Sequence, residues 1–194
     1  SGRMFESNFF EFFSRVPPWQ PPAIFLPVIA WTSYRAFVMG STVPMFVGMF
    51  LLGLMNWTLM EYWLHRLLFH YEASGKMGKR LIWIFHGVHH DWPNDKMRLV
   101  FPPGLSVPLA LAFWLLYTAA FGETFRYAAF AGLTLGYLSY DMIHYYVHHF
   151  APKNAVGKWL RKWHLAHHFK EDAAGKGFGV STPLWDYVFR TRLW

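Results

Sequence analysis

The stretch Val43–His70, VPMFVGMFLLGLMNWTLMEYWLHRLLFH, joins a long apolar run directly to two histidines. The run ends at Leu64, and its length is close to the roughly 20 residues that a helix needs to cross a bilayer. His65 and His70 follow at once, and Glu61 lies one helical turn before the first of them. The pattern predicts a membrane-spanning helix that carries histidines at its end.

All eleven histidines fall into four such clusters. The clusters read H-x4-H, H-x2-H-H, H-x3-H-H and H-x2-H-H, and they contain His65 and His70; His86, His89 and His90; His144, His148 and His149; and His164, His167 and His168. Imidazole is a common ligand of iron, zinc, copper and nickel, and the lack of cysteine excludes thiolate sites. Because one metal ion offers only about six positions, the sequence predicts two ions.

The composition is that of a membrane protein. The chain is 54% hydrophobic and 15% charged, whereas an average soluble domain is about 25% charged. Four apolar stretches run approximately over Ile24–Met39, Val43–Leu64, Leu105–Phe121 and Phe125–Val147. We expect an all-α integral membrane protein with four transmembrane helices as two hairpins and a histidine-rich helical cap that holds the dimetal site. The alternative, a soluble protein with buried core helices, has too little polar surface to cover so many apolar residues.

Basic residues indicate the orientation. The loops near Gly40–Thr42 and Gly122–Thr124 carry no lysine or arginine, while six basic residues lie between Arg66 and Arg98 and eight between Lys153 and Arg192. An excess of basic residues marks the cytoplasmic side of a membrane. We therefore expect a multi-pass protein of the bacterial inner membrane or endoplasmic reticulum, with its site facing the cytosol. Its net charge of +7 is explained by this topology and by anionic head groups, and no motif for nucleic acid is present.

An internal repeat organises the chain. The histidines at positions 65, 70, 86, 89 and 90 recur 79 or 78 residues later as His144, His149, His164, His167 and His168. Each half is thus expected to be a helical hairpin followed by two histidine clusters, within one domain over residues 1–194. Residues 3–22 are expected to form an interfacial segment, because several phenylalanines fall near one helical face before a proline-rich break. A disordered leader is the alternative.

Helical geometry predicts which histidines act together. Positions three and four apart share a face at about 100° per residue, so the second and fourth clusters should each converge. In the third cluster the same rule joins His148 to His144, although the repeat alone would align His149 with His70. We choose His148 and expect His149 to pack or to donate a hydrogen bond nearby.

The first cluster and two carboxylates carry further expectations. His65 and His70 are five apart, which favours a helix that ends between them, for instance after position 67 or 68. Glu61 and Asp141 precede histidines by about one turn. A carboxylate there can accept the second N–H of a ligand histidine and fix its ring. A head group or arginine partner is the alternative for each.

The four clusters, in this order, resemble the histidine boxes of the membrane fatty acid hydroxylase and sterol desaturase superfamily. Zinc-protease H-E-x-x-H and the E-x-x-H pairs of carboxylate di-iron bundles are absent. The strings between the boxes are most similar to fatty acid 2-hydroxylases, over about residues 56–190. These strings are Glu61-Tyr-Trp-Leu-His-Arg66, Arg98-Leu-Val-Phe-Pro-Pro103, Gly136-Tyr-Leu-Ser-Tyr-Asp-Met-Ile-His-Tyr-Tyr146, Gly177-Phe-Gly-Val-Ser-Thr182 and Leu184-Trp-Asp-Tyr187.

The resemblance implies a dimetal centre with ten histidine ligands, and we assign no catalytic residue beyond them. Matched position by position, the ligands are His65, His70, His86, His89, His90, His144, His148, His164, His167 and His168. The implied reaction is O2-dependent hydroxylation at C2 of a long-chain fatty acid or of a fatty acyl group of a sphingolipid. Iron is the expected working metal, and zinc, which has no redox chemistry, could only be an inactive substitute.

The resemblance also implies partners and alternatives. We find no similarity to the haem-binding loop of a fused cytochrome b5 domain, so electrons are expected from a separate cytochrome b5, ferredoxin or reductase. Lys158, Arg161 and Lys162 could receive an acidic carrier, although the charge bias across the membrane explains them equally well. A sister oxidase acting on sterols, carotenoids or sphingoid bases would share the boxes. A membrane metal carrier or zinc hydrolase is a third class.

Overall fold

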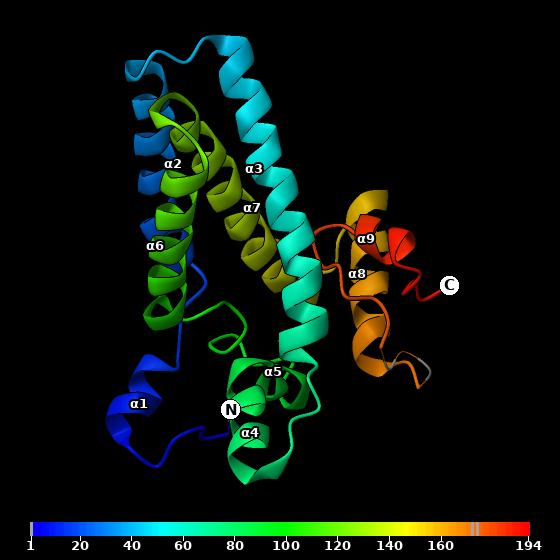
Figure 1. The fold of residues 1–194 in the computed structure, drawn as a ribbon. Coiled ribbons are helices and arrows are strands. Elements are labelled where there is room, and N and C mark those ends of the chain that lie inside the picture. The colour runs from blue at the N-terminus through cyan, green and yellow to red at the C-terminus, as the bar shows by residue number, and fades with distance from the viewer. Residues whose placement is uncertain (1, 172, 174) are drawn as a thin grey trace. The chain divides into compact units, whose positions relative to one another are not determined.

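The computed structural model describes residues 2–171, 173 and 175–194. Over these residues all regular secondary structure is helical, as the sequence predicted (Figure 1). In chain order the elements are α1 (Asn8–Phe13), α2 (Gln20–Val38), α3 (Val43–Leu64), η1 (His65–Phe69), α4 (Gly75–Ile82), η2 (Trp83–Gly87), α5 (Val88–Asp91), α6 (Pro103–Ala120), α7 (Glu123–His149), α8 (Ala155–Phe169) and α9 (Leu184–Val188). The four predicted apolar stretches correspond to α2, α3, α6 and α7.

Within the described residues, two segments are long and apolar enough to cross a membrane. They are Val43–Phe69, which joins α3 to η1, and Pro103–Ala120, which is α6. Only 11% of the most apolar part of each is buried within the protein, whereas the core helix of a soluble protein is mostly buried. The exposed apolar surface therefore favours lipid as the surroundings of these two helices.

Contacts group the chain into two compact units. The first, called the helical unit, comprises residues 19–57 and 101–139. The second, called the histidine unit, comprises residues 1–18, 58–100 and 140–194 and contains every histidine. Helices α3 and α7 each begin in the helical unit and end in the histidine unit, so each apolar helix runs directly into a histidine cluster.

In the helical unit, α3 and α7 cross at two glycines. A Cβ atom on Gly53 would lie 1.8 Å from the carbonyl oxygen of Ala129, and one on Gly132 would lie 1.9 Å from that of Phe50. Both positions thus require the absence of a side chain, as is common where helices pack closely in membranes. Gly53 and Gly132 are 79 residues apart, so the repeat seen in the histidines extends to this crossing.

The N-terminal segment belongs to the histidine unit. The buried guanidinium of Arg98 lies 2.5 Å from the Glu11 carboxylate and 2.8 Å from the Ser14 hydroxyl, and Val16 N–H donates to the Met97 carbonyl. Helix α1 exposes Phe9, Phe10, Phe12 and Phe13. The segment is thus ordered rather than a disordered leader, and its place at the membrane interface stays a prediction.

The first cluster lies on a π-helix that ends between its two histidines, as predicted, although after position 69 rather than 67 or 68. Element η1 spans His65–Phe69, and the N–H of His70 donates to the His65 carbonyl at 3.1 Å. A hydrogen bond between residues five apart defines this wider turn. It brings the two histidine side chains together where the helix ends, since His70 directly follows Phe69, the last residue of η1. A second π-turn, η2, contains His86.

Candidate metal centre

Five helical elements carry ten histidines into one region of the histidine unit. The first cluster lies on η1 and the residue that follows it, the second on η2 and α5, the third at the C-terminal end of α7, and the fourth on α8. Most of these rings are buried, and His164 at 0% and His65 at 1% exposure are almost completely so. Buried imidazoles in such number need polar partners, and their arrangement shows that they supply them to one another.

The ten rings form two groups of five. The first group is His65, His70, His86, His90 and His167, and the second is His89, His144, His148, His164 and His168. Within each group the five nitrogen atoms that could bind a metal lie within 4.8 Å of one another. The structure therefore brings together all ten residues that the sequence singled out, and it places His148 in a group and His149 in neither.

Each group of five takes one histidine from the other half of the repeat. His86 and His90 lie in the first group, but His89 between them belongs to the second. Likewise His164 and His168 lie in the second group, whereas His167 belongs to the first. The prediction that the three members of each cluster converge is therefore wrong for the middle member, which belongs to the other group. Each group therefore contains residues from both halves of the chain.

The spacing of the Nε2 atoms fits a metal ion in each group. Neighbouring Nε2 atoms lie 3.0–3.1 Å apart in the first group and 2.8–3.0 Å apart in the second. Two nitrogens bound at right angles to one ion at about 2.1 Å are about 3.0 Å apart. Five nitrogens also exceed the four of a tetrahedral structural zinc site. The donor set suits an ion of higher coordination number.

Two backbone carbonyls orient rings of the first group. The Nδ1–H of His65 donates to the carbonyl of Phe178 at 2.6 Å, and that of His167 donates to the carbonyl of Lys176 at 2.8 Å. With the proton on Nδ1, the lone pair of Nε2 faces the other rings. Such a partner fixes both tautomer and ring direction.

The segment that supplies these carbonyls is held by two buried carboxylates. Glu61 accepts from the N–H groups of Val180 and Ser181, at 2.5 and 2.8 Å, and from the Ser181 hydroxyl. Asp186 accepts from the N–H groups of Phe178 and Gly179, at 2.9 and 2.8 Å. Asp186 therefore holds the backbone at positions 178 and 179, and Glu61 holds it at positions 180 and 181.

Glu61 thus acts one step further from the metal centre than the sequence suggested. The Nδ1 atom of His65 bonds to the carbonyl of Phe178, whereas this carboxylate accepts from the N–H groups of Val180 and Ser181. The strings 177–182 and 184–187 carry the family resemblance, but the sequence indicated no role for Asp186 or for the carbonyls of Phe178 and Lys176. Asp141 is buried on α7, and its role toward His144 stays a prediction.

Electrostatics keep the histidines neutral. Burial, followed by the proximity of His167 and His90, lowers the pKa of His70 from 6.5 to about 3. Burial, followed by His167 and His148, lowers the pKa of His90 to about 4. Only a neutral imidazole has a free lone pair for a metal. Because burial and neighbouring histidines keep these rings neutral, they can bind a metal ion at neutral pH.

Residue His149 differs from its neighbours. It is partly buried, its ring centroid is 4.5 Å from that of Tyr145, and its Nε2 atom has no hydrogen-bond partner among the described residues. It lies outside both groups of five. Its place agrees with packing rather than metal binding.

Comparison with known proteins gives the family. Residues 50–191 match the profile described as fatty acid hydroxylase. The chain belongs to the fatty acid hydroxylase family. Among family members, it is 41% identical to a dihydroceramide fatty acyl 2-hydroxylase of Arabidopsis thaliana over 189 residues, or 97% of this chain and 79% of the relative. It is 37% identical to the fatty acid 2-hydroxylase of Homo sapiens over 213 residues, or 97% of this chain and 56% of the relative.

A solved structure of the family has the same fold. The hydroxylase domain visible in full-length scs7p superimposes with a TM-score of 0.90 at 36% identity. The match covers 96% of this chain and 70% of that one. The resemblance inferred from the histidine clusters is thereby confirmed at the level of the family, and the chain is a hydroxylase of the oxidoreductase class.

Proposed function

We propose that the two groups of five histidines bind two metal ions and that the protein uses them to hydroxylate C2 of a long acyl chain. The single observation that carries the proposal is the convergence of ten imidazoles, each group with Nε2 atoms about 3 Å apart. The ten ligands are the residues of the two groups, without His149. Family membership supplies the class of reaction.

Iron is the metal that suits this chemistry. Insertion of oxygen into an unactivated C–H bond requires a redox-active ion, which iron supplies when bound and zinc does not. In the overall balance, one C–H bond, O2, two electrons and two protons give one C–OH and one water. Zinc bound to the same ten histidines would leave the protein folded and inactive.

The role of the protein is to hold its ligands in one arrangement. The carbonyls of Phe178 and Lys176 keep the protons of His65 and His167 on Nδ1. Burial keeps protons off the remaining rings, so that no charge has to be expelled before a metal binds. Because each group draws on both halves of the chain, neither half can form a complete site alone.

The substrate class follows from the relatives. The relative from Arabidopsis thaliana is named as acting on the fatty acyl group of dihydroceramide, and a relative from Schizosaccharomyces pombe as acting on very long chain fatty acids of ceramide. For this chain we propose a long-chain acyl lipid, either free or within a sphingolipid. A lipid whose head group stays at the membrane surface would present the carbons near its carboxyl or amide to a site at the helix ends.

The membrane arrangement belongs to the same proposal. Helices α2 and α7 would also cross the membrane, which gives four transmembrane helices in all. In chain order these would form two hairpins, α2 with α3 and α6 with α7. The histidine unit would form a cap on the cytosolic side, since fourteen of the eighteen basic residues lie in it after residue 65. Electrons would come from a cytosolic carrier such as a cytochrome b5, a ferredoxin or a reductase.

The test is lipid analysis of a host without 2-hydroxy lipids that expresses the chain with an electron donor. Growth under 18O2 should give 2-hydroxy acyl groups that each carry one labelled oxygen. His86→Ala should abolish the product, and His149→Ala should retain most of it. Hydroxylation confined to a sterol, carotenoid or sphingoid base would assign the chain to a sister oxidase. Metal-dependent lipid cleavage without O2 would instead indicate a hydrolase.

A further inference from the structure

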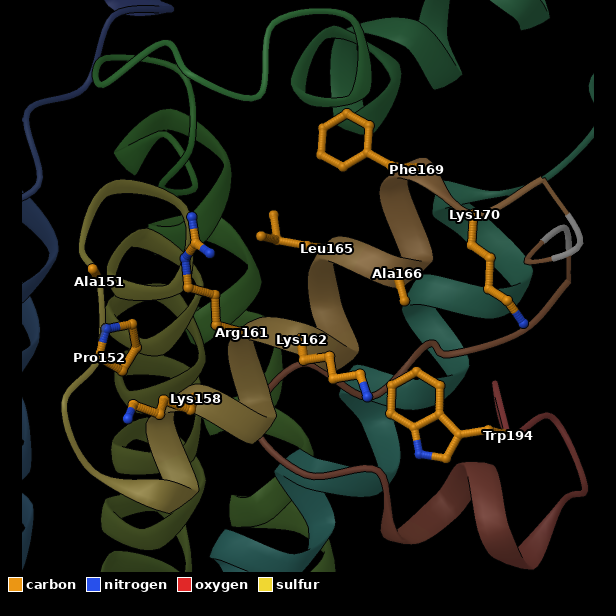
Figure 2. Close-up of a pocket in the computed structure, with 10 residues that line it drawn as sticks. All are labelled: Ala151, Pro152, Lys158, Arg161, Lys162, Leu165, Ala166, Phe169, Lys170 and Trp194. Carbon is orange, nitrogen blue, oxygen red and sulfur yellow. The ribbon is translucent and has the colours of Figure 1, made fainter.

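A basic pocket lies on the outer face of α8 in the histidine unit. It has a volume of about 940 Å³ and is open to solvent. Lys158, Arg161, Lys162 and Lys170 line it, and none of its lining residues is acidic. Apolar side chains, Leu165 among them, also line it (Figure 2). Four cations around apolar side chains form a surface that attracts an acidic partner.

Aromatic side chains border the same pocket. Phe169 is 66% exposed and Trp194 is 46% exposed, although both are large apolar residues. The Lys162 ammonium lies 5.2 Å from the centroid of the Trp194 ring, an approach that Figure 2 shows directly. Exposed aromatics next to cations are typical of the contact centre of protein interfaces.

The pocket and the metal centre lie on two faces of one helix. At about 100° per residue, His167 is about 160° round the helix from Phe169. His164 and His168 are also on α8, so this helix contributes to both groups of five histidines. A protein docked in the pocket would therefore be separated from the metal centre by about the width of one helix, roughly 10 Å.

Phe169 connects the two faces. Its ring centroid lies 5.7 Å from that of His168, which belongs to the second group. Phe169 thus lines the pocket and is largely exposed, while its ring lies next to that of a proposed metal ligand. Because electron tunnelling weakens steeply with distance, this pair of rings offers a short route from the surface to the metal centre.

We propose that the α8 pocket is the docking site of an acidic one-electron carrier protein, and that Phe169 and His168 provide the route to the metal centre. The inference rests on the proposed function, since hydroxylation needs two electrons for each O2. Each encounter oxidises one reduced carrier and transfers one electron, so two encounters complete one turnover. The two protons come from water.

The test measures docking separately from hydroxylation. The full chain in nanodiscs is mixed with the acidic haem domain of a cytochrome b5, and the association rate is followed at increasing ionic strength. Lys158→Glu combined with Lys162→Glu should slow association by about tenfold or more at low salt and flatten its salt dependence. Metal content and melting temperature should not change, because both side chains are exposed.

Matched charge reversals elsewhere provide the control. Lys76 on α4 and Arg192 near the C-terminus are exposed basic residues of the same unit that do not line the pocket. Lys76→Glu combined with Arg192→Glu changes the net charge equally and should leave association within about twofold of wild type. An equal loss in both double variants would reduce the effect to net charge and overturn the proposal.

A second variant tests the route. Phe169→Leu should leave the association rate near that of wild type and slow the oxidation of pre-bound reduced carrier by the iron-loaded protein. Unchanged oxidation would overturn the role of Phe169.

A membrane role is the competing outcome. Loss of binding to phosphatidylserine vesicles in the pocket variant, with unchanged carrier kinetics, would assign the pocket to lipid head groups. Dithionite-driven hydroxylation by the wild-type protein tests the proposed function without any carrier. Its failure would therefore be distinguishable from a failure of docking.

Discussion

The Nδ1 atom of His65 lies 2.6 Å from the carbonyl oxygen of Phe178, 113 residues further along the chain. This hydrogen bond joins the first histidine cluster to the segment near the C-terminus. That segment is itself fixed by the carboxylates of Glu61 and Asp186. The orientation of a ring in the first group of five thus depends on a loop that contributes no histidine to either group.

We expect Gly179→Ala to weaken metal binding through this loop. A Cβ atom at Gly179 would lie 2.1 Å from the carbonyl oxygen of Thr182 and 3.0 Å from Asp186, so the backbone next to Phe178 has to shift. Loss of a partner that orients a ligand costs about 10- to 100-fold in metal affinity. Competition with a chelator measures the change.

The control for this substitution is Gly104→Ala. A Cβ atom at Gly104 meets nothing within 4 Å, so the same chemical change should leave metal affinity as it was. Equal affinities of the Gly179→Ala and wild-type proteins would show that the Phe178 carbonyl does not control His65.

The adjacent pair His148 and His149 gives a second prediction. His148 lies in the second group, with its Nε2 atom 2.8 Å from that of His164, while His149 lies outside both groups. His148→Ala should therefore lower the metal content of the purified protein by about one ion per chain, and His149→Ala should keep both. Metal analysis by mass spectrometry decides it, and the reverse result would move the third cluster's ligand to His149.

Much of this site could be predicted from the sequence because metal sites use particular side chains at helical spacings. The four clusters, the bounds of α3, and the preference for His148 over His149 followed from residue type and from about 100° per residue. The division of the chain into two similar halves followed from the 79- and 78-residue spacings between the histidines.

Other features have no counterpart in residue type. The π-turn at His65–Phe69 was missed because it depends on where the neighbouring elements hold the chain, and a five-residue spacing is equally compatible with a helix end. The carbonyls of Phe178 and Lys176 were missed because every residue has a carbonyl. The exchange of His89 and His167 was missed because it depends on how the two halves of the chain pack together. The spacing of residues within one helix carries no information about that packing.

The crossing of α3 and α7 yields a third prediction. Gly53→Ala would place a methyl group 1.8 Å from the Ala129 carbonyl oxygen, so the helices must separate. Overpacking of this kind costs about 1–3 kcal/mol, which a lower melting temperature in detergent would reveal. Gly48→Ala, on the same helix with nothing within 4 Å, should leave it unchanged or slightly raised. Equal melting temperatures for the two variants would argue against close contact at Gly53.

Acidity should destabilise the metal-free protein. Burial lowers the pKa of His70 to about 3 and of His90 to about 4, whereas an unfolded histidine titrates near about 6.5. Between these values the unfolded chain binds more protons than the folded one, so stability falls as the pH falls. The loss should begin below about pH 6.5 and level off near pH 3–4.

Melting temperatures of the chelator-treated protein across this range measure the effect. His70→Asn should make the curve less steep, because one of the groups that titrate between the two states is removed. A melting temperature that rises on acidification would contradict the assigned direction of the pKa shifts.

The exchange of His89 and His167 leads to the last prediction. Each lies in a cluster whose other two members face the opposite group, so each group is closed by a residue from the other half of the chain. A metal ion in either group would join the two halves and stabilise the folded state. His89→Ala should therefore lower the occupancy of the second group and spare the first, although its own neighbours His86 and His90 belong to the first. His167→Ala should do the opposite.

Extended X-ray absorption of samples loaded with one equivalent of metal would show a five-nitrogen environment in each variant, from the intact group. Both variants should melt below wild type, and metal addition should raise the melting temperature of each by less than it raises that of wild type. If His89→Ala instead behaved like His86→Ala in metal content, coordination number and melting temperature, the second cluster would serve a single ion and the exchange would be wrong.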